Sequence, residues 1–152
     1  MSGWGPEVET MRKVAAPAGY HNQPIFDPFE AEIGPFFRAD GNDGAQKQGK
    51  PVLLALPIAE EFAGPDGNPA VGPILCFADA SMGWAVWDLL DDPPCVTLSF
   101  TADWLQKPKI GDWVYGETEV SGREGDTVTA RGTFRDQHGN TLLTTRSLWK
   151  LL

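Results

Sequence analysis

The longest apolar stretch of the chain, Pro73 to Leu90, predicts a buried helix. Over these eighteen residues, Asp79, Ser81 and Asp88 alone interrupt apolar or small side chains. A helix that is hydrophobic on every side is typically a buried one. Proline suits the first helical position, where its missing N–H has no helical partner. The sequence Asp-Asp-Pro-Pro at 91–94 ends the helix.

Patterns around this helix predict strands and loops. Four strands follow the helix, at 95–106, 111–125, 126–137 and 140–152, with hairpin turns at 123–126 and 136–140. Before the helix, the pattern predicts a short helix, a Gly-Pro break and a short strand at 29–41, then a polar loop at 42–50, a strand at 51–63 and a Pro- and Gly-rich loop at 64–72. We therefore expect an α+β fold, with one long buried helix wrapped by a curved antiparallel sheet of about five to six strands.

Residues 1–28 show no clear period and are rich in Pro and Gly, so we expect an N-terminal arm followed by a single domain over 29–152. A chain of 152 residues is long enough to bury one sizeable core. The six tryptophans and eight phenylalanines are many for this length. Most aromatic residues fill cores, but Trp84 and Trp87 could equally wall a ligand pocket.

Charge and cysteine content narrow the function classes. The net charge of −9 argues against nucleic-acid binding. Cys76 and Cys95 make neither a CxxC nor a zinc spacing, and we interpret them as reduced core residues. Asp79 and Asp88 argue against membrane insertion of the apolar helix. The N-terminal residues lack the pattern of a signal peptide, so we expect a cytoplasmic protein.

Asp79 is the main candidate for chemistry. Its neighbours one helical turn away are Leu75, Cys76, Met82 and Gly83, none of which can neutralise a carboxylate. Burial of an unpaired carboxylate raises its pKa and costs several kcal/mol in practice. Such a residue is either a functional acid in a pocket or a structural aspartate bonded to a strand hydroxyl or a backbone N–H.

The start of the helix is the second candidate feature. Backbone N–H groups at a helix N-terminus carry partial positive charge and can stabilise an oxyanion. Gly72 and Asp79 are seven residues apart, nearly on one helix face but about 10 Å apart along the axis. If both act on one carbonyl, they must come from different subunits. The alternative is that Gly72-Pro73 simply begins a helix.

Three motifs carry a family resemblance. The sequences FEAEIGPFFR, GPILCFADASMGWA and VTLSFTADWLQKPKIGDWV occur in this order and are followed by a closing hairpin. In order and spacing they resemble the phenylacetyl-CoA-type hotdog thioesterases, over roughly residues 29–150. This resemblance implies the hotdog fold and hydrolysis of an acyl-CoA or aryl-CoA thioester, with no metal and no cofactor. It further implies a homodimer, or a dimer of dimers, whose active sites lie at the dimer interface.

The resemblance also assigns residue roles. Backbone N–H groups of Val71 and Gly72 would hold the thioester carbonyl, and Asp79 of the facing subunit would be the nucleophile or the general base. Thr97 matches the position that faces the acid and can orient water, with Ser99 as the alternative.

Substrate-binding candidates follow from the same comparison and from the charge of CoA. Lys107 and Lys109 lie where the family tends to place charges that bind CoA, and Arg123 and Arg146 are further basic candidates. Asn68 lies near, but out of register with, an asparagine of the family. As isolated surface charges, the basic residues could equally serve solubility alone.

The chain departs from the family just before the helix. Ala70-Val71-Gly72 stands where the family usually carries His-Gly-Gly, and Gly64 takes the asparagine position. His21 and His138 lie in the arm and in a hairpin turn, so no histidine is beside the helix acid, as hotdog hydratases require. The alternative functions are a non-catalytic module that binds acyl-CoA or a related ligand, and a scaffold in which Asp79 only bonds a strand.

Overall fold

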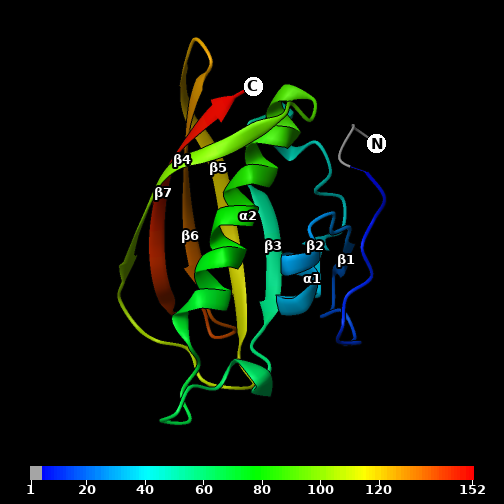
Figure 1. The fold of residues 1–152 in the computed structure, drawn as a ribbon, viewed down its shortest axis with the longest axis vertical. Helices are drawn as coiled ribbons and strands as arrows, with labels where there is room; N and C mark the ends of the chain where they lie inside the picture. Colours follow the sequence, from blue (N-terminus) through cyan, green and yellow to red (C-terminus); the bar gives the residue numbers. More distant parts are fainter. Residues whose placement is uncertain (1–4) are drawn as a thin grey trace.

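The computed structural model describes residues 5–152, and residues 1–4 of the expected arm lie outside them. One long helix lies against a single curved antiparallel sheet (Figure 1). The elements in chain order are β1 (Tyr20–Gln23), α1 (Pro28–Ile33), β2 (Phe36–Ala39), a 3₁₀ turn (Ala45–Gln48), β3 (Val52–Pro57), a 3₁₀ turn (Glu60–Phe62), α2 (Val71–Leu90), β4 (Cys95–Trp104), β5 (Trp113–Glu124), β6 (Thr127–Arg135) and β7 (Thr141–Leu151).

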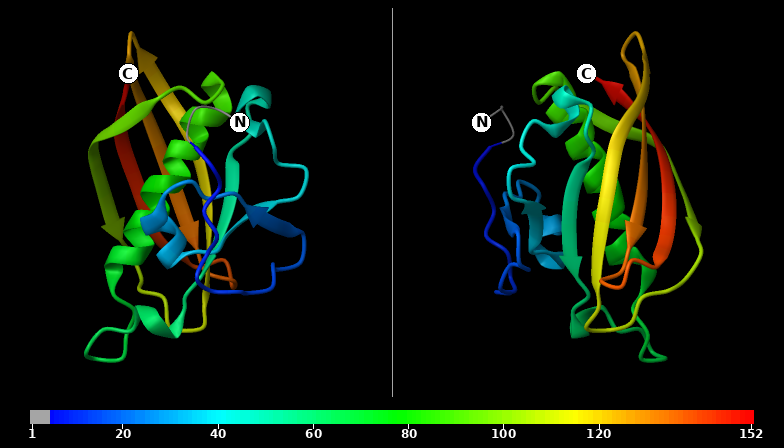
Figure 2. Two further views of the ribbon diagram at one scale, coloured as in Figure 1. Left: turned by 45° about the vertical axis from the view of Figure 1, so that its right-hand side comes forward. Right: turned by 180° about the vertical axis from the view of Figure 1, so that it is seen from behind.

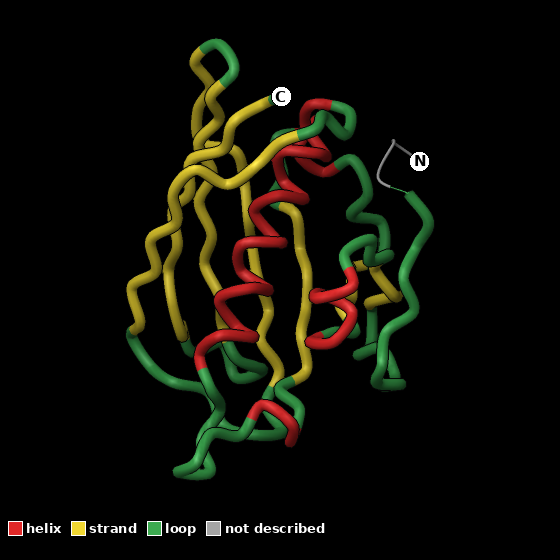
Figure 3. The backbone as a smooth tube through the Cα atoms, viewed as in Figure 1, coloured by secondary structure: helices red, strands yellow, loops and turns green. Residues whose placement is uncertain are grey.

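The described sheet has seven strands in the order β1-β2-β3-β5-β6-β7-β4, and every neighbouring pair is antiparallel. The sheet curves around one side of α2, as the view from behind shows (Figure 2). The secondary-structure colouring shows the short α1 across β3 from α2 in this view, with the short β1 and β2 next to α1 (Figure 3). The predicted long helix and the four strands after it are confirmed, with ends within two residues of those expected.

Two expectations need correction. The sheet has seven strands instead of five to six, because Tyr20–Gln23, inside the expected arm, pairs with β2 through the backbone. This strand is short and polar, so no hydrophobic alternation marks it. The strand expected over 51–63 ends at Pro57, and the chain then forms a 3₁₀ turn that buries Phe62.

The core joins helix and sheet through three aromatic rings packed edge to face. Phe36 and Phe77 have ring centroids 5.2 Å apart, and Phe77 and Phe134 follow at 5.9 Å. All three rings are fully buried. The ring of Phe134 lies over the backbone of Gly116 and Gly132, where an added Cβ would come within 2.6 and 2.7 Å of ring atoms. The two glycines therefore make the slot in the sheet that accepts this ring.

None of the helices within residues 5–152 combines the length and the apolar character needed to cross a membrane.

We predict that Gly116→Ala lowers the free energy of unfolding by about 1–3 kcal/mol, because the new methyl overpacks a filled core. Urea denaturation followed by tryptophan fluorescence measures this. Gly72→Ala is the matched control, since a Cβ there meets no described atom within 4 Å. Equal stabilities of the two variants would contradict the interpretation that Gly116 leaves room for the ring of Phe134.

Candidate functional site

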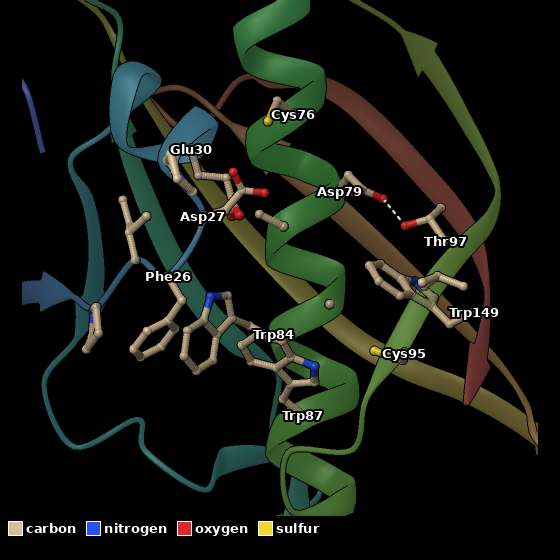
Figure 4. A pocket seen from close by; sticks show the side chains of 16 residues that line it. Phe26, Asp27, Glu30, Cys76, Asp79, Trp84, Trp87, Cys95, Thr97 and Trp149 are labelled. Carbon is tan, nitrogen blue, oxygen red and sulfur yellow. Dashed lines mark hydrogen bonds between the residues drawn. The ribbon is translucent and has the colours of Figure 1, made fainter. Parts of the chain in front are cut away.

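A pocket of about 560 Å³ lies beside the middle of α2. Its walls come from α2, from the segment around α1, and from β4 and β7 (Figure 4). The aromatic lining consists of Phe26, Trp84, Trp87 and Trp149, and the carboxyl groups are those of Asp27, Glu30 and Asp79. Trp84 and Trp87 are partly buried and both line this pocket, and Trp84 also packs against the core.

Asp79 projects from α2 toward β4, where Thr97 meets it. The Thr97 hydroxyl donates a hydrogen bond of 2.8 Å to Oδ1 of Asp79. Burial raises the pKa of Asp79, and the Thr97 hydrogen bond partly opposes this by favouring the charged form. Within the described residues, no other side-chain hydrogen bond and no ion pair reaches this carboxyl. A carboxylate with one donor, a raised pKa and a pocket beside it is suited to accept a proton or to attack a carbonyl.

Asp88, the other acid inside α2, has a different environment. Its carboxylate accepts backbone hydrogen bonds from Gly44 and Gln46 at 3.0 and 2.8 Å. It also pairs with Arg38, which is only 3% exposed, at 3.3 Å. These three partners explain Asp88 as a structural residue that fixes the 3₁₀ turn against α2. Asp79 has no such set of partners, so the two acids of one helix lie in different environments.

Glu30 is the functional candidate that the sequence did not reveal. It lies in the first turn of α1, where an acidic residue is ordinarily explained by its favourable interaction with the helix dipole. The fold turns it into the pocket of Asp79. Burial raises the pKa of Glu30 to about 7, and the negative charges of Asp27 and Asp79 add to the effect. Asp79 is 49 residues further along the chain, so no local pattern could have paired these two acids.

The two cysteines line the same pocket and are free thiols. Burial, followed by the charges of Glu30 and Asp79, raises the pKa of Cys76 to about 12. Burial also raises the pKa of Cys95, opposed by a hydrogen bond with Trp87. Both thiols therefore stay protonated at neutral pH, which does not favour a role as nucleophile.

The start of α2 presents open backbone donors. Ala70 is the N-cap and provides no side-chain capping bond, while its own N–H bonds the Phe62 carbonyl at 2.7 Å. Val71 and Gly72 are exposed. Neither residue lines the pocket of Asp79, which lies about two helical turns further along α2. One chain therefore holds the acid and the helix start apart, as the spacing predicts.

The remaining predicted site residues do not converge on the pocket. Asn68 is exposed and bonded to Asp66 through its backbone and side-chain nitrogens at 3.1 and 3.2 Å. Ser99 is exposed, because an irregularity between Thr97 and Ser99 interrupts the alternation of β4. Of the two hydroxyl candidates, Thr97 is the one that contacts Asp79.

The basic candidates do not gather in one place: three lie at two ends of the molecule, and Arg146 is exposed in the middle of β7. Lys107 and Lys109 are exposed in the connection after β4, at the same end as the loop before α2 (Figure 1). Asp66 in that loop has a pKa lowered mainly by Asn68, and the Lys107 charge contributes. Arg123 lies in the β5–β6 hairpin at the opposite end and bonds the Gly125 carbonyl at 3.0 Å.

Arg12 holds the acid-bearing helix α1 in place. Its Nε donates to the Gly34 carbonyl at 3.0 Å, just beyond α1. Its guanidinium carbon lies 5.1 Å from the ring centroid of Phe62. Phe62 in turn accepts the backbone bond from Ala70 at the start of α2. One side chain of the N-terminal segment thus links the segment carrying Glu30 to the start of α2.

Comparisons with known proteins confirm the resemblance to hotdog-fold thioesterases. The family model "Thioesterase superfamily" matches residues 72–143, from α2 into β7. The structure of the Escherichia coli PaaI protein from the phenylacetic acid degradation operon matches with a TM-score of 0.70 and 14% identity, over 83% of this chain and 85% of that one. No functionally curated protein matches the chain.

Two similar solved structures contain CoA or a CoA ester. A hypothetical thioesterase from Streptococcus pneumoniae, solved with coenzyme A, matches with a TM-score of 0.63 and 17% identity, over 68% of this chain and 79% of that one. The smu.793 protein of Streptococcus mutans, bound to acetyl CoA, matches with a TM-score of 0.58 and 13% identity, over 68% and 82%. At these identities the likeness establishes the fold.

We predict that Glu30→Gln stabilises the protein at pH 8 by up to about 2 kcal/mol and has little effect near pH 4. The folded-state pKa of Glu30, about 7, lies above its ordinary value of 4.5. Ionisation therefore costs the folded state stability as the pH rises through this interval, and glutamine removes that cost. Denaturation curves at both pH values measure the effect. Glu32→Gln, an exposed position on the same helix, is the control and should change stability little at either pH.

Proposed function

We propose that this hotdog-fold chain, which resembles the thioesterase superfamily, hydrolyses an acyl-CoA or aryl-CoA thioester to the free acid and CoA. The observation that carries the proposal is Asp79, a partly buried acid with a raised pKa, held by Thr97 and facing a pocket. The family match over 72–143 and the CoA-containing structural neighbours support the same substrate class.

Asp79 can act in either of two ways. As a general base it takes a proton from water while the water oxygen attacks the thioester carbonyl; the C–S bond then breaks, and the CoA thiolate receives the proton. As a nucleophile its carboxylate oxygen attacks the same carbon, CoA leaves, and water cleaves the resulting anhydride. In both routes the carbonyl oxygen becomes negative and needs N–H donors.

We propose that these donors are the N–H groups of Val71 and Gly72 of a partner subunit. The free edge of β4 supports this, because within the described residues β4 pairs only with β7. Val96 and Leu98 on this strand are 45% and 55% exposed. A ten-residue edge strand with exposed apolar side chains is a template for pairing with a second chain.

The direction of β4 makes such a pairing productive. The strand runs back along α2, so its Trp104 end lies near the start of α2 and its Cys95 end near the end of α2 (Figure 1). Suppose that two copies of β4 pair antiparallel around a two-fold axis near the middle of the strand. Thr97 and Asp79 of one chain would then lie opposite the Trp104 end of the partner's β4, and the start of the partner's α2 lies at that same end. We propose a homodimer of this kind, which can pair again into a dimer of dimers.

The polyanionic CoA would bind at the end of the molecule that carries Lys107 and Lys109. These two residues are exposed beside the loop that precedes α2, and they provide local positive charge on a chain of net charge −9. Asn68 lies in that loop and could contact the same ligand; Arg123 lies too far along the sheet to join it within one chain. A cytoplasmic location remains part of the proposal.

The second candidate function is a non-catalytic module that binds acyl-CoA. It is favoured by Ala70, which supplies no side chain to cap or polarise the helix start where the family carries histidine. Thioesters would then bind without turnover.

The deciding experiment incubates the protein with aliphatic and aryl CoA thioesters and measures free thiol. We expect turnover in the wild type and a loss of about 10²–10⁴-fold in kcat for Asp79→Asn. Tight binding without turnover would replace the enzyme by the binding module. If neither turnover nor binding is found and the Asp79 variant is badly destabilised, the protein is a scaffold in which Asp79 only bonds a strand.

Thr97→Val should move the acidic limb of the pH–rate profile to higher pH, because the hydroxyl favours the charged carboxylate. The base form of Asp79 then appears only at higher pH, so kcat/KM falls roughly tenfold at pH 6 and less at pH 9. Thr101→Val, on the exposed face of the same strand, is the control. An unshifted limb would remove Thr97 from the mechanism.

Leu98→Lys should convert the dimer to a monomer and abolish turnover, since a charge on the β4 edge opposes pairing. Sedimentation and the thiol assay measure the two effects together. Met11→Lys, at another exposed apolar position away from β4, should retain both the dimer and the activity. A fully active monomer would contradict the split site.

A further inference from the structure

The pocket of Asp79 combines aromatic walls with carboxyl groups that no basic side chain neutralises. We infer that it takes an acyl group ending in an organic cation, either an amine or a quaternary ammonium group. This inference rests on the proposed thioester hydrolysis, and it names the acyl class that the same site would prefer.

The aromatic wall is the first support. Phe26 and Trp84 have ring centroids 6.4 Å apart, and Trp84 and Trp87 follow at 4.9 Å in an edge-to-face arrangement. These rings gather on one side of the pocket, below the acids of the α1 segment (Figure 4). Aromatic faces attract organic cations, most strongly tryptophan and most strongly where water is excluded.

The charge of the lining is the second support. Asp27, Glu30 and Asp79 face the pocket, and none of its described lining residues is Lys, Arg or His. Within residues 5–152 none of these three acids forms a salt bridge.

Acids elsewhere in the chain are often paired, as Asp88 is with Arg38 and Glu119 with Arg131. Asp27 accepts one bond, from the Phe29 N–H at 2.8 Å, which caps α1. Glu30 has no side-chain hydrogen bond among the described residues. Burial is the main cause of the raised pKa of Glu30, and repulsion by the charges of Asp27 and Asp79 adds to it.

The alternatives fit less well. A metal ion needs converging ligands, and residues 5–152 contain no group of three His, Cys, Asp or Glu side chains arranged to hold one. An acyl group ending in a carboxylate would add a further negative charge. A neutral alkyl or aryl group would suit the rings but would desolvate Glu30 and Asp79 without compensating their charge. An organic cation satisfies the rings and the acids together.

The test uses three CoA thioesters of nearly equal shape. In 4-(trimethylammonio)butyryl-CoA the chain ends in a cation, in 5,5-dimethylhexanoyl-CoA a carbon replaces the nitrogen, and in glutaryl-CoA a carboxylate stands at the same place. We expect kcat/KM to be at least tenfold higher for the cationic ester than for its neutral isostere, and lowest for glutaryl-CoA.

Two variants connect this preference to the pocket. Glu30→Gln and Trp84→Leu should each reduce the ratio of cationic to neutral ester by about tenfold while turnover of the neutral ester persists. Glu32→Gln, on the same helix but outside the pocket lining, should leave the ratio unchanged. A ratio near one in the wild type, or a ratio unaffected by Glu30→Gln, would overturn the inference.

Binding separates this inference from the proposed hydrolysis. Calorimetric Kd values for the same three esters are measured on the wild type and on Asp79→Asn, in which the proposed catalytic acid is absent while Asp27 and Glu30 remain. A wild type that hydrolyses the neutral and cationic esters equally well keeps the proposed function and rejects the cation preference. A wild type without turnover, combined with a tenfold lower Kd for the cationic ester, rejects hydrolysis and keeps the preference.

Discussion

Burial of the largely apolar helix α2 is the constraint on which the rest of the structure depends. In this chain the sheet that curves around α2 covers its apolar side chains, and glycines permit the close approach. Gly116 and Gly132 leave room for the ring of Phe134, and a Cβ on Gly83 would come within 2.9 Å of Trp149. Helix, sheet and aromatic core therefore form one packing unit, and the orientation of α2 determines where its few polar residues emerge.

The two acids within α2 show how the fold treats charge in such a helix. Asp88 is neutralised by Arg38 and by backbone donors from the preceding loop, so its burial is compensated locally. Asp79 receives one hydroxyl and faces a cavity instead. Since burial of a carboxylate is costly in both cases, the difference in partners separates a structural acid from the acid that we propose to be reactive.

Asp79 lies beside the edge strand β4, and this position determines which parts of the site one chain can supply. The acid is bonded to β4, the strand whose other edge is free within the described residues. A single chain then contains the acid and the pocket, while its own helix start is about two turns away. An arrangement in which two chains complete each other's sites is consistent with this geometry, and it makes assembly and activity inseparable in the proposed enzyme.

Much of the fold could be predicted from the sequence, because its evidence is local. The apolar run ending at Leu90 and the alternation after Cys95 each reflect burial of neighbouring residues, so α2 and β4 to β7 are recognisable one segment at a time. The anomalous position of Asp79 is visible in the same way. β1 was missed because its four polar residues are stabilised by backbone pairing, which leaves no hydrophobic pattern.

The composition of the pocket was decided by the tertiary structure alone. From its neighbours in sequence, Glu30 is an ordinary acid at a helix start. Most residues that share its pocket, Asp79 among them, come from segments far along the chain. Its environment arises only when α1 is packed against α2 and the aromatic side chains close around it. The chain by itself therefore determined which helix is buried and which acid is out of place. The fold decided what surrounds that acid, because desolvation and charge repulsion depend on distances in space and not on separation in sequence.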